Sequence, residues 1–150
     1  MCFSLHPGLL SNPTKPRGRL GGIYRNFVSK TIDGNEAFSH GEFAKALAHF
    51  EASLSHSRKI FSMSVLEQDG SDDAVHTLII SRNNLAHTLF RLQRLEQAEN
   101  HFDLLVRTLT FWKDSKNSSS NFRKACLDHL PYTKEKHMNY RISIGKNPFV

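Results

Sequence analysis

The sequence predicts an all-α fold of antiparallel helical hairpins. Two stretches, residues 34–54 and 86–106, repeat one arrangement of small and aromatic residues, and aligning Ala46 with Ala98 superimposes them. Apolar residues recur at steps of three and four, the spacing of one helix face, and no segment alternates convincingly as a strand does. With 150 residues, 39% of them apolar, the chain suits one domain with a hydrophobic core.

The repeated pattern has a steric reason. Two antiparallel helices approach closely where their contact residues are small, and larger side chains fill the space beside the crossing. We therefore expect small residues to meet across each hairpin and aromatic residues to interlock next to them. The residues in these roles are Gly34, Phe38, Ala46, Phe50, Ala86, Phe90, Ala98 and Phe102.

The turn inside each hairpin is predicted from the same alignment. Gly41 lies where the first helix must end and the chain reverse, in the left-handed conformation that glycine adopts without strain. Gln93 takes the equivalent place in the second hairpin, where it is a poorer turn residue.

On these residues the chain resembles the tetratricopeptide repeat family. That pattern has a small residue at the eighth place, an aromatic near the eleventh or twelfth, alanine at the twentieth and an aromatic at the twenty-fourth. The likeness covers residues 30–112 and extends to small stand-alone bacterial proteins of this class. It implies a TPR-like α-solenoid of two repeats that binds partners rather than transforming them.

The repeat period differs from that of the family. Ala46 and Ala98 are 98 − 46 = 52 residues apart, whereas the family's period is about 34. Two neighbouring helices, each longer by about nine residues, would absorb the excess and meet at a tight turn near Asp69 and Gly70. A long disordered loop is the alternative, but residues 60–80 are too apolar for one.

These patterns set the expected elements and their boundaries. We expect helices at 27–40, from Glu42 to just before the turn at 68–71, at 72–92, at 95–112 and at about 122–131, where Pro131 ends the last. Residues 117–120 form a loop that ends in a helix cap. A short helix at 134–140 is an alternative for the tail.

The expected domain organisation has three parts. Residues 1–25 form a flexible basic arm, 26–131 a TPR-like helical domain with a C-terminal capping helix, and 132–150 a C-terminal tail. Two repeats are fewer than the three or so that a solenoid needs. The capping helix, the elongated helices or formation of a homodimer would complete the stack.

Charge is unevenly distributed. Residues 1–32 carry five basic side chains and no acidic one, a net charge of 5 − 0 = +5. The net charge is 7 − 11 = −4 over residues 33–112 and 8 − 3 = +5 over residues 113–150. The basic arms suggest, as an alternative function, binding of nucleic acid or an acidic partner. Nucleic acid is disfavoured because neither arm interleaves aromatic residues with its charges. The first arm also leaves open a transit peptide or a mis-assigned start.

Other features exclude classes of protein. No apolar run approaches the length of a membrane span. Cys2 and Cys126 do not form the spaced set of a disulfide framework, so we expect a cytoplasmic protein. His49 and His56 are too far apart on their helix for a metal pair, and Cys126 with His129 lacks an orienting third group. We expect no catalytic residues, no metal and no cofactor.

The predicted function is a non-catalytic scaffold or adaptor for a peptide or protein of unknown identity. First helices of such hairpins line a concave face, where Glu36, Ser39 and His40 would add polar groups. The resemblance implies a carboxylate clamp as a narrower alternative, since Asn35 and Asn84 match its asparagines, although Thr31 replaces its first lysine. The candidate peptide-binding residues are Asn35, Arg82, Asn83, Asn84, His87 and Arg91.

Overall fold

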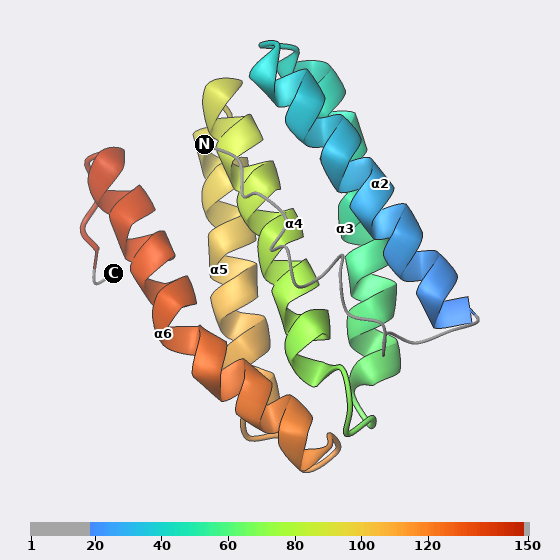
Figure 1. Ribbon diagram of the computed structural model, residues 1–150. Coiled ribbons are helices and arrows are strands. Elements are labelled where there is room, and N and C mark those ends of the chain that lie inside the picture. Colours follow the sequence, from blue (N-terminus) through green and yellow to red (C-terminus); the bar gives the residue numbers. More distant parts are fainter. Residues whose placement is uncertain (1–18, 149–150) are drawn as a thin grey trace.

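The computed structural model describes residues 19–148, which form five α-helices and no strand. The helices are α2 (Arg19–Ser39), α3 (Phe43–Ser64), α4 (Ser71–Arg91), α5 (Leu95–Trp112) and α6 (Ser120–Ser143). They lie in two layers: α2, α4 and α6 side by side, and α3 and α5 behind them (Figure 1). Each helix packs against the next in the chain, and α4 also packs against α6. The predicted all-α fold of antiparallel hairpins is confirmed.

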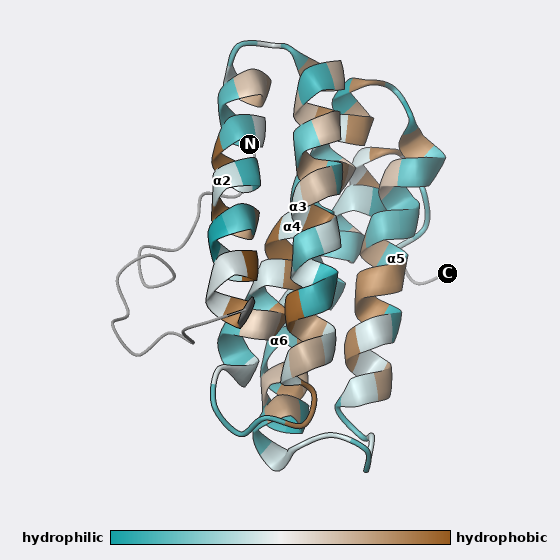
Figure 2. Ribbon diagram, turned by 90° about the vertical axis from the view of Figure 1, so that its right-hand side faces the viewer, coloured by the Kyte–Doolittle hydropathy of each residue, from teal (hydrophilic) through white to brown (hydrophobic). Residues whose placement is uncertain are grey.

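Hydrophobic and hydrophilic residues alternate along each helix (Figure 2). The largest buried cluster joins α3, α4, α5 and α6, and it includes Phe61, Leu78, Leu105, Phe122 and Cys126. The last helix therefore covers the end of the stack, as its predicted capping role requires. None of the described helices has the length and apolar character needed to cross a membrane.

Small residues lie where the first hairpin closes. Gly34 faces the ring of Phe50, so that a Cβ at Gly34 would lie 2.5 Å from the nearest ring carbon. Ala46 and Phe50 are fully buried there. In the second hairpin Ala86, Ala98 and Phe102 share one buried cluster. These contacts agree with the steric argument from the sequence.

Two of the expected aromatic residues are less enclosed. Phe38 is only partly buried, and its ring makes an edge contact with Phe43 at 5.1 Å. Phe90 is 36% exposed and contacts Tyr140 of α6, with ring centroids 6.1 Å apart. Phe90 therefore packs toward the capping helix rather than interlocking inside its own hairpin.

The hairpin turns have the predicted backbone conformation. Gly41 has φ +75° and Gln93 has φ +60°, so both positions are left-handed. Gly70, also left-handed at φ +77°, ends the turn between α3 and α4. Elongated α3 and α4 meet at this turn, which confirms that the excess of the repeat period lies in longer helices.

A row of buried hydroxyl groups links the first three helices. The Thr31 hydroxyl donates to the carbonyl of Phe27 at 2.8 Å and lies 2.8 Å from the Ser53 hydroxyl, which lies 3.2 Å from that of Ser81. All three side chains are fully buried. Their small size lets α2, α3 and α4 approach closely, while their hydrogen bonds offset the loss of water.

Helix α2 begins earlier than predicted. It starts at Arg19 rather than near residue 27, so residues 19–25 of the expected flexible arm are helical. Tyr24 and Phe27 are buried against Ile60, Ala74 and Ile80, with Leu20 and Ile23 beside them. This apolar contact outweighs the low helix propensity of two adjacent glycines. Residues 1–18 of the predicted arm lie outside the described residues.

Helix α6 continues through Pro131, which the sequence analysis placed at its end. Pro131 is exposed, and it lies one turn after exposed Leu127 on the solvent side of the helix. The carbonyl that loses its donor therefore faces water. Leu130, Thr133 and Tyr140 are buried on the opposite side. The predicted boundary at 131–132 consequently falls inside one helix.

The predicted cap of α6 is present at Ser119. Its hydroxyl oxygen accepts a hydrogen bond from the backbone N–H of Phe122 at 3.0 Å, and the same hydroxyl donates to the carbonyl of Glu67 at 2.6 Å. The backbone N–H of Ser119 also donates to the carbonyl of Val65 at 2.8 Å. This serine begins α6 and attaches it to the turn between α3 and α4.

Candidate functional site

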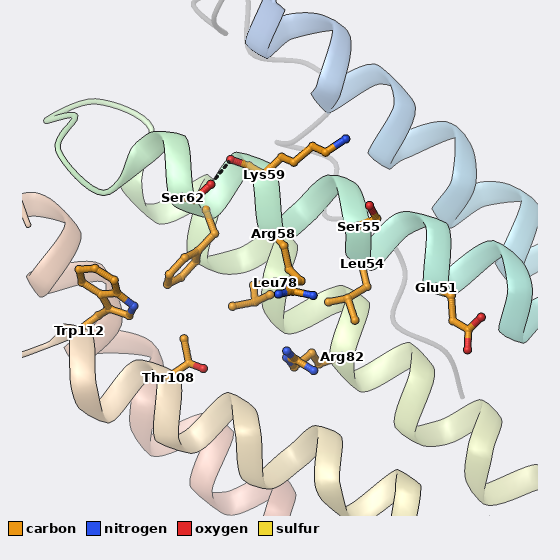
Figure 3. Close-up of a pocket in the computed structure, with 11 residues that line it drawn as sticks. Glu51, Leu54, Ser55, Arg58, Lys59, Ser62, Leu78, Arg82, Thr108 and Trp112 are labelled. Atoms are coloured by element: carbon orange, nitrogen blue, oxygen red, sulfur yellow. Dashed lines mark hydrogen bonds between the residues drawn. The ribbon is translucent and has the colours of Figure 1, made fainter.

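A groove of about 640 Å³ lies between α3 and α5, with α4 at its base (Figure 3). We call it the α3–α5 groove. Its lining residues are Glu51, Leu54, Ser55, Arg58, Lys59, Phe61 and Ser62 of α3, Leu78 and Arg82 of α4, and Thr108 and Trp112 of α5.

Helical periodicity brings these residues together. Leu54, Arg58 and Phe61 follow each other at steps of four and three on one face of α3. Leu78 and Arg82 are one turn apart on α4, as are Thr108 and Trp112 on α5. Because α4 packs against both α3 and α5, it holds the two walls of the groove apart.

The base of the groove is apolar. Leu78 is buried, and Leu54 packs partly buried against the same core. Trp112 lies at one end, where its ring meets that of Phe61 edge-on at 6.3 Å. Glu51 lies at the other end. A ligand in the groove would therefore contact apolar side chains at the base and polar side chains along the walls.

The charged side chains of the groove are mainly basic. Arg58, Lys59 and Arg82 line it, and we call them the cation cluster. Glu51 is the acidic residue of the lining. Among residues 19–148, no carboxylate lies within ion-pair distance of any member of the cluster.

Arg82 is held on one side by a histidine of α5. Its Nη1 lies 3.0 Å from Nδ1 of His101. A guanidinium group only donates hydrogen bonds, so Nδ1 of His101 must accept and the imidazole carries its proton on Nε2. Burial, together with the charge of Arg82, lowers the pKa of His101 to about 4. The histidine is consequently neutral at pH 7.

The Nε of Arg82 is buried, and no acceptor among residues 19–148 receives a hydrogen bond from it. Burial lowers the pKa of Arg82, and the charge of Arg58 lowers it further. The groove thus contains a desolvated donor and two guanidinium groups of like charge.

The six predicted peptide-binding residues do not form one exposed surface. Arg82 faces the α3–α5 groove, whereas Asn83 and Asn84 are almost completely buried in α4. Asn35 is half-buried on α2. Because neither α4 asparagine is exposed, the carboxylate clamp that the resemblance implies has no accessible amide at Asn84.

His87 and Arg91 also serve local contacts. His87 meets the ring of Phe102 edge-on at 6.3 Å, and burial is the main cause that lowers its pKa to about 4. The Arg91 guanidinium lies 4.6 Å from the ring centroid of Phe43, a cation–π contact at the end of the first hairpin. These two residues link α4 to the neighbouring helices α5 and α3.

The cysteine and histidine weighed as a thiol and base are not paired. Cys126 is fully buried, and burial raises the pKa of its thiol to about 12. His129 instead lies 2.8 Å from a carboxylate oxygen of Asp72 and stacks on His76. Within the described part of the chain, no group of three or more His, Cys, Asp or Glu side chains is placed to hold a metal ion.

Many basic residues of the C-terminal region have acidic partners. Arg141 and Lys146 both pair with Glu99 of α5. Burial alone would raise the pKa of Glu99, but its contacts with these two cations outweigh that effect and lower it. Lys124 pairs with Asp128, and Lys113 pairs with Asp114. Much of the positive charge of this region is therefore neutralised locally.

The comparison with family models finds DUF2753, a protein family of unknown function, over residues 26–148. The chain belongs to this family. Neither the curated proteins nor the solved structures that were compared with it gave a match.

The cation cluster is the part of the site that sequence reasoning missed. Arg82 was named, but for the face formed by the first helices. The available signal was the adjacent pair Arg58 and Lys59, two of the seven basic residues in a region that is acidic as a whole. Their spacing from Leu54 and Phe61 places them beside an apolar strip.

Proposed function

We propose that this protein is a non-catalytic scaffold that binds a segment of another protein, and that the α3–α5 groove holds this segment. The observation that carries the proposal is the groove itself, an open channel between two hairpins with an apolar base and three basic side chains in its lining. Its volume lies in the range of sites that bind specific ligands.

The composition of the groove favours binding over catalysis. Its hydroxyl groups belong to Ser55, Ser62 and Thr108, and its lining includes neither histidine nor cysteine. A nucleophilic hydroxyl needs an adjacent base within hydrogen-bond reach. Here the nearby histidine, His101, accepts from Arg82 instead.

The tetratricopeptide-like architecture belongs to the same proposal. Its support is the contact of Gly34 with Phe50 and the two left-handed turn residues at equivalent places. Stacked hairpins of this kind offer extended surfaces to partner segments. A cytoplasmic location is consistent with the free thiol of Cys126.

Photo-crosslinking tests this function. A photoreactive amino acid at Ser55, which is exposed in the groove, should give covalent adducts with a defined protein in cells that make this protein. The matched position is Ser39, exposed at the end of α2. Adducts at Ser55 but not Ser39 are expected, and the absence of adducts at both positions would count against a scaffold.

A further inference from the structure

Arg82 of the cation cluster carries a buried donor that no acceptor among the described residues satisfies. Arg82 is partly buried, and its Nε is enclosed by the protein without a hydrogen-bond acceptor among residues 19–148. Burying a charged donor without a partner is costly, and the cost is recovered when an acceptor arrives. The Arg82 guanidinium group, which lines the groove, therefore suits an acceptor supplied by a ligand.

The guanidinium group of Arg58 indicates that the acceptor should be negatively charged. Arg58 extends from α3 and Arg82 from α4, and their side chains approach each other inside the groove (Figure 3). Two like charges facing one space repel each other, and an anion between them removes that repulsion. Carboxylates form strong charge-assisted hydrogen bonds with guanidinium groups.

The size and shape of the groove indicate more than a single anion. About 640 Å³ is far larger than a carboxylate, and the groove is open to solvent. The apolar surface of Leu54 and Leu78 continues to Trp112 at one end. An occupant should therefore combine a carboxylate with an apolar side chain, as a stretch of polypeptide does.

We propose that the α3–α5 groove binds an acidic segment of a protein partner, with a carboxylate between Arg58 and Arg82 and an apolar side chain against Trp112. This inference rests on the proposed scaffold function and specifies the chemistry of its partner. Glu51 at the far end favours a basic residue there, so the basic and the apolar residue lie on opposite sides of the acidic one.

The spacing of the groove residues sets the spacing in the segment. Glu51 and Arg58 are seven residues apart on a helix, roughly 10 Å, which an extended chain crosses in about three residues. From Arg58 to the level of Ser62, near Trp112, is roughly 6 Å, or about two residues. The expected order is a basic residue, two spacers, an acidic residue, one spacer and an aromatic residue.

The chain carries its own reporter for this test. Trp112 is the single tryptophan of the sequence, and it lines the groove. We would titrate the full-length protein with the capped peptide Lys-Ser-Gly-Asp-Ser-Phe and follow tryptophan emission. A saturable change is expected, and replacing the peptide's Asp with Asn or its Phe with Ala should weaken binding at least tenfold.

Matched variants locate the binding. Arg58→Glu should weaken binding of the acidic peptide at least tenfold, and a peptide with Lys in place of Asp should then bind the variant better than the parent protein. Lys134→Glu makes the same charge change at an exposed position of α6 and should have little effect. Both side chains are exposed, so the fold should survive both changes.

Three results would overturn the proposal. The first is a titration in which tryptophan emission shows no saturable change. The second is that Arg58→Glu and Lys134→Glu weaken binding of the acidic peptide equally. The third is that a ten-residue oligothymidylate binds more tightly than the peptide. Adducts at Ser55 in cells combined with failure of the peptide would leave the scaffold function standing and remove only the acidic partner.

Discussion

Gly34 is the residue at which the packing of the first hairpin is most exacting. A Cβ there would lie 2.5 Å from the ring of Phe50, which is fully buried and cannot move aside freely. We expect Gly34→Ala to lower the free energy of unfolding by about 2–3 kcal/mol through overpacking. Urea denaturation measures this change.

Gly22 supplies the control for Gly34. A Cβ at Gly22 would have its nearest neighbour, the side chain of Arg25, at 3.8 Å. Gly22→Ala should therefore stabilise α2 by about 0.5–1 kcal/mol, the difference in helix propensity. Equal effects at the two glycines would contradict the steric account of the hairpin.

Gln93 carries backbone strain that its counterpart Gly41 avoids. Both residues are left-handed, at φ +60° and +75°, but only glycine adopts this conformation without a Cβ penalty. We expect Gln93→Gly to stabilise the protein by about 0.5–1 kcal/mol, and Gly41→Gln to destabilise it by about 1 kcal/mol. Thermal melts of the two variants should shift in opposite directions, and shifts of the same sign would refute this account.

At the level of residues, the sequence predicted the packing contacts inside the hairpins better than it predicted the binding surface. Gly34, Ala46 and Ala98 have one steric role, which spacing along a helix reveals. The groove depends on how α3, α4 and α5 are arranged in space, and a single repeat pattern does not contain this information. Arg82 was therefore recognised as a candidate but assigned to the wrong side of α4.

At the level of helices, the bounds could be predicted where apolar residues recur at helical spacing without a glycine or proline between them. The bounds of α3, α4 and α5 agree with the sequence within a few residues. The start of α2 was missed because the glycines at 21 and 22 and the prolines before them outweighed a regular pattern of Leu20, Ile23, Tyr24 and Phe27. The continuation of α6 was missed because a proline inside a helix is tolerated only on a solvated side, which sequence alone does not identify.

Pro131 offers a test of the continuous α6. In the interior of an exposed helix, proline is less favourable than alanine by about 3 kcal/mol, part of which the local structure already accommodates. We expect Pro131→Ala to stabilise the protein by about 1–2 kcal/mol. Urea denaturation of this variant beside Lys134→Ala, an exposed neighbour, provides the measurement. No gain over the neighbour would mean that α6 is interrupted at this residue.

For the whole molecule, two partly buried histidines predict a pH dependence. Burial is the main cause that lowers the pKa of both His87 and His101 to about 4, against an ordinary value of 6.5. Between these values the unfolded chain binds more protons than the folded one, so stability falls as pH falls from 6.5 toward 4. The melting temperature should be lower at pH 5 than at pH 7.5.

His101→Gln isolates part of this effect, because its amide oxygen can accept the hydrogen bond of Arg82 without titrating. The fall in melting temperature between pH 7.5 and 5 should be smaller in this variant. Glu99 does not interfere, since the lowered pKa of this carboxyl places its loss of stabilisation below pH 4.5. A melting temperature that is unchanged or higher at pH 5 would contradict the burial of these histidines.

Self-association stays a prediction at this scale. Large apolar side chains are exposed at Leu66, Phe111, Leu127 and Ile142. Light scattering across micromolar concentrations tests whether the protein forms a homodimer. A molecular mass equal to that of one chain at every concentration would exclude the homodimer.

We propose that the partner binds in the α3–α5 groove and not on the surface of α2, α4 and α6. Chemical-shift mapping of the ¹⁵N-labelled protein with the acidic peptide distinguishes the two surfaces. We expect shifts confined to Ser55, Arg58, Ser62, Arg82, Thr108 and the indole of Trp112. Shifts along the exposed sides of α2 and α6, with the groove signals unmoved, would contradict it.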